Sequence, residues 1–112
     1  MVLPRPQEGR IAVTQYEEET LAKIRVAPPG EVLDLVEEAW DKNYGSALDY
    51  LTPAEWRMVD GMRGDKYLRL ATGGWSWNEE VIEAFGDNTV GWGVHWVLSV
   101  YGGLHIFRRI PE

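Results

Sequence analysis

The corner that organises this chain is Gly73-Gly74-Trp75-Ser76-Trp77-Asn78-Glu79-Glu80, because it joins a strand pattern to a helix pattern. Residues 66–72 before it alternate in polarity, which predicts a strand with Leu68 and Leu70 facing the core. The Ser-x-x-Glu spacing of residues 76–79 predicts a capping box, and Gly86 is expected to close the helix that follows. The apolar side chains at core spacing on this helix are Trp77, Val81, Ala84 and Phe85.

Residues 89–110 predict a β-hairpin, since Gly102-Gly103 suits the positive φ angles of a two-residue turn. In that register Val100 pairs with His105, and Trp96 pairs with Arg109. One face of the hairpin is expected to carry a row of apolar residues, namely Trp92, Val94, Trp96, Leu98, Val100 and Phe107. The opposite face is also too apolar to be fully wet, so either helices cover both faces or one face meets a partner. The second half of the chain is therefore expected to be a β-α-β-β unit.

The first half of the chain predicts helices. The Thr-x-x-Glu spacing of residues 14–17 predicts a short helix over 15–25, with a strand as the alternative, and Pro28-Pro29-Gly30 ends it. Residues 46–51 are expected to add one further helical turn. A second capping box, Thr52-Pro53-Ala54-Glu55, predicts another helix from about Pro53. The side chains that this helix is expected to bury are Trp56, Val59 and Met62.

The clearest helix runs from Glu31 to Lys42 and is amphipathic. Its apolar side carries Val32, Leu35, Val36, Ala39 and Trp40. Its other side carries the carboxylates of Glu31, Asp34, Glu37, Glu38 and Asp41. Over the whole chain, residues 1–60 hold 12 acidic and 6 basic residues, whereas residues 61–112 hold 6 and 5. Any acidic surface is therefore expected in the first half, centred on this helix.

Length and composition limit the class of protein. With 112 residues, 45% of them hydrophobic, the chain is expected to fold as one domain that buries about two thirds of its unfolded surface. We expect an α+β domain over 1–112, made of an extended arm (1–13), a helical part (14–64) and the β-α-β-β part (65–112). The absence of cysteine excludes disulfides and thiolate chemistry.

Charge and hydropathy limit the partners and the compartment. The formal charge of −7 argues against direct binding to nucleic acid, because phosphate affinity depends on lysine and arginine. No apolar run is long enough to span a membrane or to serve as a signal peptide. We therefore expect a cytoplasmic protein without a membrane partner.

Few residues are of the types that carry chemistry. His95 and His105 are expected on opposite faces of the hairpin, which argues against a shared metal ion and favours polar positions at the sheet rim over catalysis. Glu79-Glu80 and Glu83 lie at a helix start, where the helix dipole favours acids, so capping and exposure are favoured over acid–base catalysis. No lysine follows Gly73-Gly74, and no phosphate-binding motif is present. We predict no catalytic residue, no metal ligand, no cofactor and no enzymatic activity.

Trp75 and Trp77 are the candidate binding residues of the corner. Two indoles two positions apart in one turn do not easily both point inwards, so one of them is expected to be exposed. Exposed tryptophans are enriched at binding hot spots. The alternative is that Trp75 folds over the hairpin as a hydrophobic staple.

The segment from Leu68 to Ala84, followed by Gly91-Trp92 and by Tyr101-Gly102-Gly103-Leu104-His105-Ile106-Phe107, resembles a family of small uncharacterised proteins of bacteriophages and prophages. In that family a Thr-Gly-Gly-Trp-Ser-x-Asn-Glu corner precedes a short helix, an aromatic strand and a Gly-Gly hairpin. The resemblance covers roughly residues 66–109, and Trp77 departs from the small residue expected at its position. No activity is assigned to the family, so the resemblance implies none.

The resemblance does imply a kind of function. Small acidic phage proteins without catalytic residues often occupy a host protein's surface, where carboxylates can stand in for nucleic-acid phosphates. We therefore expect an inhibitor of a host protein, including the anti-defence kind typified by anti-CRISPR proteins. Its expected contact residues are Glu31, Asp34, Glu38, Asp41, Trp75 and Trp77. The alternative is a small-molecule or peptide-binding module at the Trp75/Trp77 corner, and a self-associating homo-oligomer is the third choice.

Overall fold

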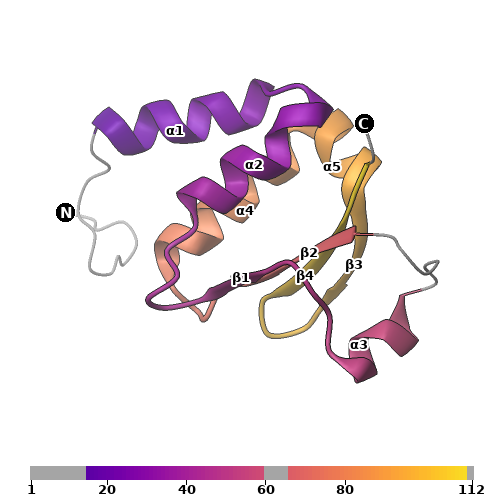
Figure 1. Cartoon of the computed structure of the whole chain (residues 1–112). Helices are drawn as coiled ribbons and strands as arrows, with labels where there is room; N and C mark the ends of the chain where they lie inside the picture. Colours follow the sequence, from indigo (N-terminus) through magenta and orange to yellow (C-terminus); the bar gives the residue numbers. More distant parts are fainter. Residues whose placement is uncertain (1–14, 60–65, 111–112) are drawn as a thin grey trace.

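A computed structural model describes residues 15–59 and 66–110 of the chain (Figure 1). These residues form a mixed α+β fold in which four helices lie over one face of an antiparallel sheet and a fifth lies against the other face. The helices are α1 (Gln15–Val26), α2 (Pro29–Ala39), α3 (Pro53–Met58), α4 (Ser76–Asp87) and α5 (Thr89–His95). The strands are β1 (Ser46–Leu48), β2 (Lys66–Ala71), β3 (Trp96–Val100) and β4 (Leu104–Arg109). The predicted α+β class is confirmed, and the expected arm over 1–13 lies outside the described residues.

The sheet has the strand order β1-β2-β4-β3, and every neighbouring pair is antiparallel. Leu68 and Leu70 of β2 are fully buried under the helices, as the alternating pattern predicts. Leu68 pairs across the sheet with Phe107, which belongs to the same core. A second, smaller cluster on the opposite face consists of Leu51, Val59, Tyr67 and Ile106. The sheet therefore separates two apolar layers.

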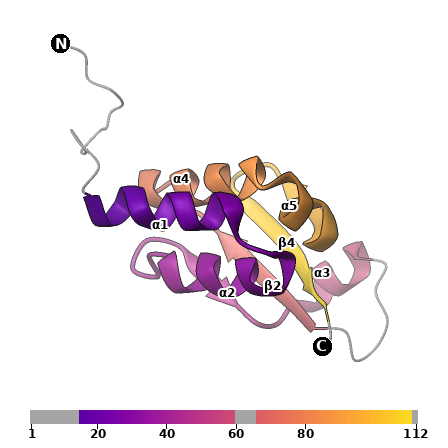
Figure 2. The same ribbon diagram turned by 90° about the horizontal axis from the view of Figure 1, so that it is seen from above.

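The helical layer begins with α1 and α2, which lie side by side over the strands (Figure 2). The predicted helices over 15–25 and 31–42 are confirmed, although α2 begins at Pro29, where proline suits the first turn, and ends at Ala39. Trp40 follows α2, and its indole Nε1 donates to the carbonyl oxygen of Ala71 at 3.2 Å. This bond ties the end of α2 to the end of β2. None of the helices described is long and apolar enough to cross a membrane.

The capping box of α3 is confirmed. Thr52 Oγ1 accepts from the backbone N–H of Glu55 at 3.2 Å, and Glu55 Oε1 accepts from that of Thr52 at 3.0 Å. Val59 is buried as expected, but Trp56 is 40% exposed and lies edge-on against Tyr67. The predicted burial of Trp56 is wrong because the side chain that α3 buries is Glu55, which meets Arg69 of β2, whereas the indole contacts Tyr67 and stays partly exposed. Met62 lies outside the described residues.

Residues 46–51 do not add a helical turn. Ser46–Leu48 is strand β1, which pairs with β2 from Ser46 opposite Ala71 to Leu48 opposite Arg69. The segment forms a strand because pairing with β2 satisfies its backbone N–H and C=O groups, whereas it is too short to form a stable helix of its own.

Helix α4 buries the predicted side chains, but its ends differ from the prediction. The N-cap is Trp75, whose side chain makes no capping hydrogen bond, so the expected capping box of Ser76 and Glu79 does not form. Gly86 lies inside α4, which continues to Asp87. Two side chains of the first turn of α4, Trp77 and Asn78, instead bond to backbone groups of residues outside the helix.

The largest correction concerns residues 89–95, which form helix α5 and not a strand. Asn88 Oδ1 accepts from the backbone N–H of Gly91 at 3.0 Å, and its Nδ2 donates to two carbonyl oxygens at the end of α1, both at 2.9 Å. This asparagine caps α5 and holds it against α1, which overrides the alternating pattern that favours a strand. Trp92 and Val94 therefore belong to a helix and not to the predicted apolar row of the hairpin.

The hairpin of β3 and β4 forms in a register different from the predicted one. Val100 pairs with Leu104, so the loop contains the three residues Tyr101-Gly102-Gly103. Its two glycines have φ angles of 102° and 93°, which favour glycine. An irregularity early in β3 then places Trp96 opposite Phe107.

Candidate functional site

The tryptophan corner, Trp75 and Trp77, lies where β2 leads into α4 and beside the end of α2 (Figure 1). Trp77 is only 9% exposed, and its indole Nε1 donates to the carbonyl oxygen of Ala39 at 2.7 Å. Trp75 is half-buried and stacks on Tyr44, with ring centroids 4.1 Å apart and 20° between the ring planes. Of the two predicted contact residues, Trp77 therefore belongs to the interior, whereas Trp75 keeps a partly accessible ring.

A fully buried asparagine, Asn78, fixes this corner to α2. Its Oδ1 accepts from the backbone N–H of Asp41 at 2.8 Å, and its Nδ2 donates to the carbonyl oxygens of Asp41 at 3.1 Å and Thr72 at 3.2 Å. Asn78 was not among the site residues predicted from the sequence. The sequence feature that could have identified it is that Asn78 shares a helix face with the apolar residues Val81 and Phe85. An amide on such a buried face is tolerated only when its hydrogen bonds are satisfied.

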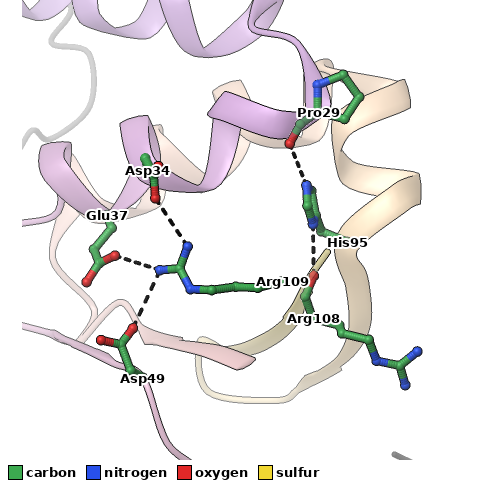
Figure 3. Close-up of polar contacts among 7 residues, drawn as sticks. All are labelled: Pro29, Asp34, Glu37, Asp49, His95, Arg108 and Arg109. Carbon is green, nitrogen blue, oxygen red and sulfur yellow. Dashed lines mark hydrogen bonds and ion pairs between the residues drawn. The ribbon is translucent and has the colours of Figure 1, made fainter. Parts of the chain in front are cut away.

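Arg109 forms ion pairs with two of the carboxylates on the acidic face of α2, those of Asp34 and Glu37 (Figure 3). Arg109 ends β4, and its Nη1 lies 3.2 Å from Asp34 Oδ1, while its Nη2 lies 2.7 Å from Glu37 Oε1 and 3.5 Å from Asp49 Oδ1. The Asp34 side chain remains 79% exposed and that of Glu37 is 28% exposed, so the contact with Glu37 is the sheltered one. The predicted site residue Asp34 is thus partly neutralised within the chain.

The other predicted carboxylates of α2 stay apart from Arg109. Glu31 and Glu38 are exposed, and neither forms an ion pair within residues 15–59 and 66–110. Asp41 is half-buried, and its Oδ1 accepts from the backbone N–H of Asn43 at 3.0 Å. The carboxylates that Arg109 does not contact are therefore Glu38 and Asp41 at the end of α2 and Glu31 near its start.

The two histidines do not form a joint site. His95 is buried at the end of α5, where its Nδ1 lies 2.8 Å from the carbonyl oxygen of Arg108 and its Nε2 2.7 Å from that of Pro29 (Figure 3). The predicted position at the sheet rim is wrong for His95, because the register that placed it there does not form. His105 is half-buried, with Nδ1 2.7 Å from Ser99 Oγ, and burial lowers its pKa. In the part of the chain that is described, no group of three His, Cys, Asp or Glu side chains could hold a metal ion.

A buried ion pair that the sequence analysis did not identify joins α3 to the sheet. Arg69 Nε donates to both carboxylate oxygens of Glu55 at 2.8 Å, and Glu55 is 7% exposed. Burial by itself raises the pKa of Glu55, but the N–H of Thr52 and the guanidinium of Arg69 outweigh it and hold the pKa below its ordinary value. The Thr-x-x-Glu spacing predicts the cap but carries no information about Arg69. The pair holds α3 against the sheet, and neither Glu55 nor Arg69 lines any of the three hollows that the structure shows among residues 15–59 and 66–110.

No protein-family model, no curated protein and no solved structure matches this chain. The resemblance to a phage protein family therefore stays a prediction.

Proposed function

We propose that this protein is a non-enzymatic inhibitor that binds a host protein through the carboxylates of α2. The observation that carries the proposal is that Glu31 and Glu38 are exposed on one helix and form no ion pair within the described residues. They are seven residues apart, which is two helical turns or about 10 Å along one face. Carboxylates that are not paired internally keep their attraction for a basic surface and can guide its approach.

The charge of the whole chain supports a basic partner. Its formal charge is −7, and a surface that holds nucleic acid is rich in lysine and arginine. The proposal therefore extends to a host protein that binds nucleic acid, as an anti-defence inhibitor of the anti-CRISPR kind would require. A row of carboxylates on a rigid helix competes for such a surface without any reaction taking place.

The test is to compare the host proteins that bind wild-type chain, Glu31→Lys and Glu83→Lys in a lysate. Glu83 is an exposed acid on α4, so its reversal is a control with the same change in charge. We expect wild type and Glu83→Lys to retain one host protein at a stoichiometric ratio and to release it as salt is raised. Glu31→Lys should retain much less while its circular dichroism is unchanged. Equal retention by both variants, or no retained protein, would contradict the proposal.

A second function is favoured by the accessible part of the Trp75 ring. A small-molecule or peptide-binding module at the tryptophan corner would use this ring without Trp77, whose indole is buried and bonded to Ala39. Such a module should show quenching of tryptophan fluorescence by its ligand, and Trp75→Leu should abolish the quenching. Quenching that survives this substitution would exclude the corner.

A further inference from the structure

A groove lies between the first turn of α1, the end of α2 and the tryptophan corner. Its volume is about 450 Å³, within the ~300–1,000 Å³ typical of ligand pockets. Its lining includes the carboxylates of Glu17, Glu38 and Asp41 and the aromatic rings of Tyr16 and Trp75, and residues 15–59 and 66–110 contribute no lysine, arginine or histidine to it. A hollow with aromatic walls and carboxylates at its edge is complementary to a positively charged group.

The end of α2 adds to this negative potential. The last carbonyl groups of a helix carry partial negative charge, which a basic side chain in the last turn usually offsets. Helix α2 has no basic residue in its last turn. Glu38 lies in that turn and Asp41 two residues beyond the helix, and Arg109 reaches neither of them within the described contacts. The groove therefore combines two carboxylates with the negative end of the helix dipole.

We propose that this groove binds one arginine side chain of the partner protein, with the guanidinium held by Glu38 and Asp41 and the ring of Trp75 as its aromatic wall. This inference rests on the proposed function, because it names the feature of the host protein that the chain recognises. Arginine fits better than lysine, since its planar guanidinium donates parallel N–H bonds to carboxylates and stacks on aromatic rings. One face of the Trp75 ring is already covered by Tyr44, so the indole is held in place before the arginine arrives.

The structure favours a single arginine over a run of basic residues. A smaller hollow of about 110 Å³ lies further along α1 and α2, where Lys23 joins Glu38 in the lining. The ammonium of Lys23 would repel a second cation that followed the groove in this direction. The segment recognised is therefore one arginine without a second basic residue on the side that faces Lys23.

The test is an NMR titration of the full ¹⁵N-labelled chain with the end-blocked peptide Gly-Ser-Arg-Ala-Gly. The matched probe replaces arginine with citrulline, which has nearly the same shape but no charge. We expect the arginine peptide to shift the indole N–H signal of Trp75 and the backbone signals of residues 38–41, and the citrulline peptide to leave them unchanged. Glu38→Gln should weaken binding about threefold, as expected for one exposed charge pair, and the control Glu83→Gln should not weaken it.

Three results would overturn the inference: no shift with the arginine peptide, equal shifts with the citrulline peptide, or equal affinities of Glu38→Gln and wild type. A shift of the Trp75 signal in the free protein on Arg5→Gln or Arg10→Gln would assign the groove to an arginine of this chain, and would also refute a partner arginine. The proposed function is judged separately. Host-protein capture that depends on Glu31 but not on Glu38 would support the proposed inhibitor and refute arginine binding in the groove. Host-protein capture that does not depend on Glu31, together with normal binding of the arginine peptide, would refute the inhibitor and support the groove.

Discussion

Replacing Asn78 with alanine should lower the free energy of unfolding by about 3 kcal/mol. The amide makes three hydrogen bonds to main-chain groups, two of them with Asp41 and one with Thr72. Asn78 is fully buried, so alanine leaves these groups where water does not replace the lost partner. The Asp41 N–H is left unpaired, at a cost of about 1–3 kcal/mol. The carbonyl oxygens of Asp41 and Thr72 keep backbone N–H donors from Tyr44, Gly45 and Trp75, so each bond lost there costs only about 0.5–1.5 kcal/mol, and the total is about 3 kcal/mol. That is a large share of the ~5–15 kcal/mol by which small proteins are stable.

Urea unfolding followed by tryptophan fluorescence measures this loss. With a slope of about 1.5 kcal/mol/M, a loss of about 3 kcal/mol moves the unfolding midpoint down by about 2 M. Asn43→Ala, at an exposed asparagine close to the same corner, is the control and should move the midpoint by less than about 0.3 M. Asn78→Asp should be as damaging near neutral pH, because it places an oxygen where Nδ2 faces two carbonyl oxygens. A loss below about 1 kcal/mol for Asn78→Ala would refute the view that this side chain holds the corner to α2.

Gly73 and Gly74 form a matched pair, since both have positive φ angles of 66° and 73°, but only at Gly73 would a Cβ atom collide with the backbone of Tyr44. Thermal unfolding should show a loss of about 1 kcal/mol for Gly74→Ala and a much larger one for Gly73→Ala, and equal losses would contradict the packing argument. The pKa of Glu55 lies below its ordinary value of 4.5, so the ionised group stabilises the fold above that value, and the stabilisation is lost as pH falls through the lowered pKa. Glu55→Gln should therefore destabilise most at neutral pH and progressively less toward acid, as a series of urea titrations would show, whereas a pH-independent loss would exclude ionisation as the cause. His95→Phe should lower the unfolding free energy by about 2 kcal/mol, because the carbonyl oxygens of Arg108 and Pro29 lose the ring nitrogens that face them. A change below about 0.5 kcal/mol would show that neither contact stabilises the fold.

Elements whose stabilising contacts lie within a few residues could be predicted from the sequence. Helix α3 begins after Thr52 because both halves of its cap lie three residues apart in the chain. The exposed and buried faces of α2 follow from the helical repeat, and the burial of Leu68 and Leu70 follows from the period of two in a strand. In each case the pattern and the structure share one local cause.

Elements held by distant contacts could not be predicted in the same way. The cap of α5 is Asn88, whose Nδ2 bonds to carbonyl oxygens 61 and 64 residues earlier in the chain. Without those partners, residues 89–95 show only an alternation that is typical of a strand. Strand β1 likewise exists only through its pairing with β2. The hairpin has a three-residue loop where two glycines suggest a two-residue one, and an irregularity between Trp96 and Leu98 shifts the start of β3 again.

The candidate site depends both on local sequence patterns and on contacts between residues far apart in the chain. The carboxylates on the outer side of α2 could be predicted, but the guanidinium that takes up Glu37 and Asp34 belongs to Arg109, 72 and 75 residues away. Asp34, Glu37 and Asp49 together carry more negative charge than the guanidinium of Arg109 neutralises. Their positions are nevertheless fixed by their contacts with Arg109 at the end of β4. Formal charge therefore overstates the binding surface, because only carboxylates without an internal cation are free to reorganise around a partner. By this criterion the binding potential of α2 lies at its exposed start and at its last turn, and the last turn is where the aromatic groove also lies.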